Sequence, residues 1–251
     1  MVAAAAAVAA SPPGGTLLVT THPLPECLPS EWSRATTQAL RELADRQEQF
    51  TPFEMSDAAS KWVQGEAMNA AVSLLCDAAN SKDGCATPKR FGTLGSYFAT
   101  PGASEKELLM PSARATLRRM TERCPAWRFL LFPVHIVNHW TLVFFDRQKN
   151  AAWELDSLYT GKLTRPAQLA VEYIRRHVAG ASDCSFATAD VPQQPNYVDC
   201  GVYVMMFARH LCQVGETFTG RVRRGDIGEV GQACRSSIAR LLRRALELYA
   251  S

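Results

Sequence analysis

The chain has 251 residues, of which 47% are apolar, so it is long enough to bury one sizeable core. Its formal net charge is only +3 and its basic residues are mixed with acidic ones, which argues against a dedicated nucleic-acid binder. The sequence contains no run of 18 apolar residues, so we expect no membrane span.

The N-terminal residues give no sign of a packed structure. Residues 1–15, MVAAAAAVAASPPGG, are of low complexity, and we expect residues 1–30 to be a disordered tail and residues 31–251 to form one domain. The alanine-rich start contains no Lys or Arg, so it does not resemble a secretory signal peptide.

Eight cysteines are present, and none belongs to a C-x-x-C pair. Structural zinc sites usually require paired ligands at short spacing, so we expect no metal and no other cofactor. Reduced thiols are typical of intracellular proteins, and we therefore expect the protein in the nucleus, the cytoplasm or both.

The middle of the chain changes from a helical to a strand pattern. Within residues 50–84 a helix is predicted, because apolar residues recur at helical spacing and Asp83-Gly84 is a stop signal. The residues at this spacing are Met68, Ala71, Val72, Leu75 and Cys76. Beyond it, runs rich in β-branched and aromatic residues predict a meander of strands. These segments are a strand at 129–137 (FLLFPVHIV), a strand at 139–146 (HWTLVFFD), a turn at 147–150 (RQKN) and a strand at 151–157 (AAWELDS).

The last part of the chain is mainly helical. A helix is predicted over about 165–178 and a short strand over 184–189. The run from 200 to 212 is apolar on nearly all sides, so it predicts a central buried helix. From 227 to 248 the pattern predicts an amphipathic helix. A helix, then strands, then helices together indicate a single α+β domain.

The start of this final helix carries a second signal. Asp226 is followed three residues later by Glu229, a pair that resembles a capping box. We therefore expect Asp226 to be the N-cap residue.

Cys200 stands where the central buried helix is predicted to begin, directly before Gly201. The N–H groups at a helix N-terminus carry a partial positive charge, which favours a thiolate. Gly201 would leave the neighbouring N–H groups open, as an oxyanion hole requires. A buried, inert cysteine is the alternative interpretation, because free cysteines are often core residues.

A nucleophilic cysteine requires a base and a group that orients the base. His139 opens a predicted strand, where its side chain can point into a cleft, and Asp156 lies on the paired strand. The hairpin would place them side by side, giving a Cys–His–Asp arrangement in which the aspartate fixes the imidazole tautomer. A solvated strand-end carboxylate is the alternative for Asp156 alone. The remaining histidines lie in the proline-rich tail (His22), within an apolar strand (His135) and on helices (His177 and His210).

Gln194 lies six residues before Cys200 in a loop bracketed by Pro192 and Pro195. A rigid loop would direct its side-chain amide toward the same point as the Cys200 backbone N–H and complete an oxyanion hole. A solvated loop glutamine is the alternative interpretation.

Three segments, PVHIVNHWTLVFFD, WELDSL and PQQPNYVDCGVYV, resemble the catalytic blocks of the Ulp/SENP cysteine proteases, which process SUMO and related ubiquitin-like proteins. The order His, Asp, Gln, Cys is also that of the family, and the resemblance covers about residues 60–250. It implies a papain-like α+β fold of the adenain type, with a central mixed sheet flanked by helices. It also implies His139 as base, Asp156 as its orienter, Gln194 as oxyanion donor and Cys200 as nucleophile.

In that family two tryptophans enclose the C-terminal Gly-Gly of the substrate, and Trp62 and Trp140 stand at the matching positions. The resemblance therefore implies that both bind substrate, since a tunnel between two indoles admits only residues without side chains. We expect Trp140, next to His139, to line a cleft and to contribute little to the core. An anchor of the first helix is the alternative for Trp62, because large aromatic residues dominate cores.

The residues after Trp62 depart from the family pattern. Val63-Gln64-Gly65 stands where Leu-Asn-Asp is frequent, and the departure leaves the identity of the modifier open. We expect a cysteine isopeptidase or endopeptidase that cleaves after the Gly-Gly of SUMO or a related modifier, in deconjugation, precursor maturation or both. We expect it to act as a monomer without nucleic-acid or membrane partners.

Three alternatives remain open from the sequence. One is a protease of the same fold directed at NEDD8 or ubiquitin. Another is a catalytically silent module that binds ubiquitin-like proteins, although such a module does not need all four catalytic residue types. The last is an acyltransferase with the same triad, although such enzymes usually carry a glutamate in place of Asp156.

Overall fold

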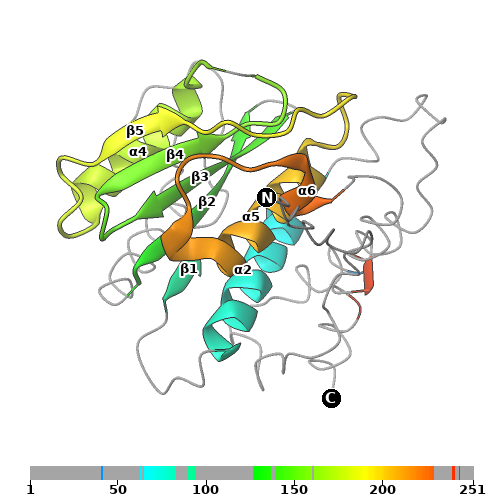
Figure 1. The fold of residues 1–251 in the computed structure, drawn as a ribbon, viewed down its shortest axis with the longest axis horizontal. Helices are drawn as coiled ribbons and strands as arrows, with labels where there is room; N and C mark the ends of the chain where they lie inside the picture. Colours follow the sequence, from blue (N-terminus) through cyan, green and yellow to red (C-terminus); the bar gives the residue numbers. More distant parts are fainter. Residues whose placement is uncertain are drawn as a thin grey trace, which may run out of the picture.

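The computed structural model places the chain around one sheet with helices on both faces (Figure 1). The predicted tail at 1–30, the start of the predicted domain and Trp62 lie outside the described residues, so the predicted domain boundary stays a prediction. The structure describes residues 41, 63, 65–82, 90–93, 127–136, 139–159, 161–228, 239–240 and 243.

In the part of the chain that the structure describes, the sheet has five strands in the order β1-β2-β3-β4-β5. β2, β3 and β4 pair antiparallel as a meander, while β1 and β5 join the two edges in parallel. The mixed sheet confirms the predicted α+β class. The strands are β1 (Phe91–Thr93), β2 (Phe129–Ile136), β3 (His139–Asp146), β4 (Ala151–Leu155) and β5 (Ser185–Thr188).

Helices cover both faces of the sheet, and each predicted helix before residue 215 is present. None of the helices in the described part of the chain is long and apolar enough to cross a bilayer. The helical elements are α2 (Gly65–Lys82), α4 (Arg165–His177), α5 (Cys200–Val214), the 3-10 turn η2 (Gly215–Thr217) and α6 (Arg224–Ile227).

β3 is buried along its whole length because its side chains alternate between two cores. Leu142 and Phe144 belong to a core cluster that β3 shares with α2 and α5. Val143 and Phe145 belong to a second cluster, which β3 shares with α4. This double burial explains why the strand reads as a continuous apolar run rather than as an alternating one.

α2 and α5 pack side by side on one face of the sheet (Figure 1). Gly201 permits this close approach, because a Cβ at that position would lie 2.6 Å from Val63 Cγ2 and 3.4 Å from Met68 Cε. Gly201 therefore serves helix packing, while the exposure of backbone N–H groups expected from the sequence stays a prediction.

β1 has no counterpart among the predicted strands. It is only three residues long, too short to give a periodic signal. The Asn80 side chain on α2 completes its edge, since Nδ2 donates to Phe91 O and Oδ1 accepts from Phe91 N, each at 2.9 Å.

The capping-box prediction at Asp226 is wrong. Asp226 is the third residue of the short helix α6, and its carboxylate accepts a 2.7 Å hydrogen bond from Arg223 N. α6 ends at Ile227, where Gly228 adopts a φ of 74° that glycine tolerates without strain. Of the predicted helix at 227–248, residues 239, 240 and 243 are helical, and 229–238 lie outside the described residues.

The close contact at Gly201 gives a stability prediction. Gly201→Ala should lower the free energy of unfolding by about 1–3 kcal/mol, because the new methyl overlaps Val63 in a packed core. Urea denaturation of the variant and the parent protein measures the difference.

Gly225→Ala is the matched control, since Gly225 is also a helical glycine and a Cβ added there would have nothing within 4 Å. It should be neutral or slightly stabilising. Equal stability of Gly201→Ala and the parent protein would contradict the packing argument.

Candidate active site

The hairpin of β3 and β4 brings His139 and Asp156 together. Leu155, the last residue of β4, pairs with Leu142, so Asp156 emerges beside the first residues of β3. His139 Nε2 lies 2.8 Å from Asp156 Oδ1, and both side chains are buried. The pairing expected from the hairpin pattern is therefore present.

Asp156 is held rigidly by its own following residues. The same oxygen, Oδ1, accepts the backbone N–H groups of Leu158 at 2.8 Å and Tyr159 at 3.1 Å. The Tyr159 ring then meets the His139 ring edge-on, with 5.6 Å between centroids. Three donors converge on one carboxylate oxygen, which fixes the direction in which it faces the imidazole.

Cys200 is the first residue of α5 and only 2% exposed. Its side chain hydrogen-bonds to His139, so the imidazole stands between the thiol and Asp156. Since Nε2 faces Asp156, the other ring nitrogen, Nδ1, is the one left for the sulfur. Because α5 begins at Cys200, the N–H groups of its first turn, which have no partner within the helix, lie at the same end of the helix as the thiol.

The charge state of His139 follows from these neighbours. Burial by itself lowers the pKa of His139, but the hydrogen bonds to Asp156 and Cys200 and the charges of both groups outweigh it. Together they raise the pKa of His139 from 6.5 to about 9. The imidazolium is thus the stable form at neutral pH, as an ion pair with a thiolate requires.

The loop before Cys200 is ordered by Asn196. Its Oδ1 accepts the N–H groups of Val198 and Asp199 at 3.0 Å each, and its Nδ2 donates to Asp199 Oδ2 at 2.7 Å. Asp199 itself is the N-cap residue of α5 and makes no side-chain capping bond to the helix. Asn196 therefore sets the position at which α5, and with it the thiol, begins.

Gln194 is buried and fixed at both ends of its amide. Its backbone N–H donates to Ser157 O at 2.7 Å, and its Oε1 accepts from Ser157 Oγ at 2.6 Å. Gln194 Nε2 carries two N–H groups, and one of them donates to Asn196 O. The second N–H is left for another acceptor, as an oxyanion donor requires.

Gln193 links this loop to the backbone of Asp156. Its Nε2 donates to Asp156 O at 3.0 Å and to Val191 O at 3.2 Å, while Arg224 Nη2 donates to Gln193 O at 3.2 Å. Sequence reasoning missed Gln193 together with Ser157, because nothing in their spacing distinguishes them from solvated loop residues. Asn196 carried a usable signal, since an asparagine shortly before a helix start favours such a turn.

Trp140 lies in the core rather than on the wall of an open cleft. It is 2% exposed and packs in the cluster shared with α2 and α5, and its Nε1 donates to Val63 O at 2.9 Å. The expectation that Trp140 contributes little to the core is wrong, since an indole with a satisfied N–H is a large packing unit. Its predicted contact with substrate, like that of Trp62, stays a prediction.

Among the residues that the structure describes, no histidine other than His139 is hydrogen-bonded to Asp156. His135 packs on Trp140 at 4.6 Å between ring centroids, and burial together with the charge of His139 lowers its pKa. His177 packs against Tyr173 on α4, and His210 is buried on α5. Within the described ranges, no group of three His, Cys, Asp or Glu residues is arranged to hold a metal ion.

Residues 103–223 match the sequence profile of the Ulp1 protease family, C-terminal catalytic domain. The match contains all four predicted catalytic positions, His139, Asp156, Gln194 and Cys200. It does not extend to α2 or to Trp62.

One curated relative and several solved structures are similar to the chain. A sentrin-specific protease of Caenorhabditis elegans is 25% identical over 164 residues, which is 62% of this chain and 21% of that protein. The chain thus spans about a fifth of the length of that relative.

The solved structures show the same fold at low sequence identity. The catalytic domain of the Ulp1-like SUMO protease from Chaetomium thermophilum is 19% identical, with a TM-score of 0.53 over 89% of this chain and 91% of that chain. The Ulp1 protease domain in complex with Smt3, the yeast orthologue of SUMO, is also 19% identical, with a TM-score of 0.51 over 86% and 97%.

The profile match and the fold agree with the geometry around Cys200. Over residues 103–223, the chain is therefore similar to the catalytic domain of the Ulp1 protease family.

Proposed function

We propose that the protein is a cysteine isopeptidase or endopeptidase that cleaves after the C-terminal Gly-Gly of SUMO or a related ubiquitin-like modifier. One observation carries the proposal. His139 is hydrogen-bonded to Asp156 on one side and to Cys200, at the first turn of α5, on the other. This is the arrangement that nucleophilic cysteine chemistry requires.

In the first chemical step the Cys200 sulfur attacks the carbonyl carbon of the terminal glycine, and a C–S bond forms. The imidazolium of His139 then gives its proton to the departing amine, as the C–N bond breaks. Asp156 keeps the imidazole oriented through Nε2 and stabilises its positive charge. The thioester that remains is hydrolysed by water, with the now neutral imidazole as base.

The oxyanion of the tetrahedral intermediate needs preorganised donors. The Cys200 backbone N–H at the start of α5 and the second N–H of Gln194 Nε2 are the donors that the geometry supports. Ser157 holds Gln194 Oε1, which prevents the amide from turning over. Loss of one such donor typically lowers kcat by roughly 10²–10³-fold.

The choice of modifier rests on the similar proteins. The curated relative is named a sentrin-specific protease, and one similar structure is bound to Smt3. We therefore propose SUMO as the modifier that this chain recognises. Reaction with NEDD8 or ubiquitin instead of SUMO would correct this choice. Free cysteines among the described residues, Cys200 included, are compatible with the proposed reducing nuclear or cytoplasmic location.

The proposal is tested with electrophilic probes built on SUMO, NEDD8 and ubiquitin, each with a reactive group in place of its terminal carboxylate. The SUMO probe should label the full chain at Cys200, as mapped by mass spectrometry. Cys200→Ser should abolish labelling without loss of folding, because serine is close in size to cysteine and the hydroxyl is not deprotonated by this base.

Cys212→Ser is the matched control, since Cys212 lies near the other end of the same helix and its substitution should leave labelling intact. Labelling by the NEDD8 or ubiquitin probe alone would correct the modifier. If no probe labels Cys200, the proposed peptidase function is wrong.

The charge on His139 gives a second prediction. Because the negative charge of Asp156 helps to raise the pKa of His139 to about 9, Asp156→Asn should lower that pKa by about 1–3 units. The imidazolium would then be lost at a lower pH, and the alkaline limit of activity would fall with it. NMR titration of the His139 ring measures the pH at which half of the imidazole is protonated. The His139→Ala variant identifies which ring signal belongs to His139.

Asp183→Asn removes an exposed carboxylate elsewhere in the fold and should leave the His139 midpoint unchanged. A midpoint that is the same in Asp156→Asn and the parent protein would show that the carboxylate does not control the base.

A further inference from the structure

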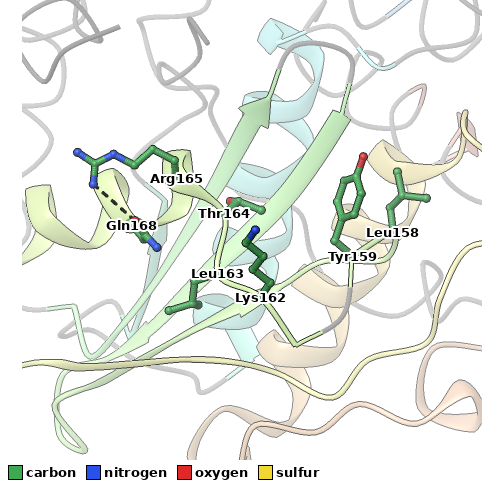
Figure 2. A pocket seen from close by; sticks show the side chains of 7 residues that line it. All are labelled: Leu158, Tyr159, Lys162, Leu163, Thr164, Arg165 and Gln168. Carbon is green, nitrogen blue, oxygen red and sulfur yellow. Dashed lines mark hydrogen bonds between the residues drawn. The ribbon is translucent and has the colours of Figure 1, made fainter. Parts of the chain in front are cut away.

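A pocket of about 700 Å³ opens beside the catalytic pair, between the end of β4 and the first turn of α4 (Figure 2). Leu158, Tyr159 and Leu163 supply its apolar surface, and Lys162 and Arg165 supply two cations. Its volume lies in the range of ligand pockets and is far larger than one side chain. It therefore fits a short peptide segment.

The pocket wall is anchored at both ends. Leu158 and Tyr159 donate their backbone N–H groups to Asp156 Oδ1. At the other end Thr164 donates to the buried Glu154 carboxylate through its N–H at 2.8 Å and its hydroxyl at 2.6 Å. Leu158 and Tyr159 are thus held to the residue that follows β4, and Thr164 is held to β4 itself.

The charge of the lining is positive. None of the described residues that line the pocket is acidic, and the nearby Glu154 carboxylate is buried and already accepts from Thr164. Arg165 is 66% exposed in its side chain, and its contacts with Glu172 Oε1 and Gln168 Oε1 are both long, at 3.5 Å. The Lys162 amine is exposed, and no ion pair or hydrogen bond engages it in the described part of the chain.

The position of the pocket indicates which part of a substrate would reach it. The Trp140 indole, along which the modifier tail is predicted to run, is hydrogen-bonded to Val63 beside α2. The pocket is lined in part by the first turn of α4. α4 packs on the face of the sheet opposite to the one that α2 and α5 cover (Figure 1). Tyr159 connects the two regions, since it lines the pocket and contacts the His139 ring. A substrate segment that leaves the thiol on the side of His139 and Tyr159 would therefore reach this pocket.

We propose that this pocket is a specificity subsite for the leaving side of the substrate, and that it receives a target-protein segment with an Asp or Glu near the modified lysine. The inference rests on the proposed peptidase function and deepens it. The apolar wall would cover the segment, and Lys162 and Arg165 would pair with its carboxylate. Because both cations are exposed, the preference they give should be moderate and sensitive to salt.

The experiment uses the full chain and lysine peptides that are isopeptide-linked to the modifier whose probe labels Cys200. One set carries a single Glu at successive positions on either side of the lysine, and the matched set carries Gln there. At the best position, the Glu conjugate should be cleaved with a kcat/KM roughly three- to tenfold higher than the Gln conjugate. This ratio should shrink as sodium chloride is added.

The double variant Lys162→Gln/Arg165→Gln should bring the Glu/Gln ratio to about one, since the ratio within one variant is independent of its overall activity. Arg176→Gln, which removes an exposed cation from the last turn of α4, should keep the ratio. A Glu/Gln ratio near one at all positions, or one that the double variant retains, would overturn the subsite. Failure to cleave even the modifier linked to a small aminocoumarin would instead overturn the peptidase function itself.

Discussion

The site depends on one buried oxygen, Oδ1 of Asp156. A buried carboxylate is costly unless it is hydrogen-bonded, and here three donors converge on that atom: His139 Nε2 and the N–H groups of Leu158 and Tyr159. The same contact therefore orients the base, stabilises its positive charge and fixes the first residues of the pocket wall. A change at this oxygen would disturb the chemistry and the neighbouring surface together.

Helix packing brings Cys200, the proposed nucleophile, next to His139, the proposed base. Gly201 lets the start of α5 approach Val63, which lies two residues before α2, and Trp140 ties the first residues of β3 to the backbone carbonyl of the same valine. Cys200 and His139 come from distant parts of the sequence, yet each adjoins a residue that contacts Val63. Trp140 is thus a structural residue whatever it does for substrate, and truncation to alanine would remove a core side chain worth about 3–5 kcal/mol.

Sequence patterns predicted the strong elements and the pairing of His139 with Asp156, because an apolar hairpin has one register that buries its side chains. The patterns did not predict elements that are too short to show a period, or contacts that form only in the folded chain. β1 has three residues and depends on Asn80, and the N-cap expected at Asp226 is displaced by α6. Gln193 and Ser157 act through contacts between two loops, which no local pattern encodes. The burial of Trp140 was missed because its neighbour His139 suggested a cleft.

The central claim is that His139 and Asp156 act as one unit on Cys200. A double-mutant cycle tests it, with kcat/KM measured on the modifier–aminocoumarin for His139→Ala, Asp156→Asn and the double variant. The small aminocoumarin does not depend on the pocket wall, so Asp156 should affect this substrate through the imidazole. Its substitution should lower kcat/KM by roughly 10²-fold or more when His139 is present, and have little further effect when His139 is absent. Losses that multiply independently in the double variant would contradict the account.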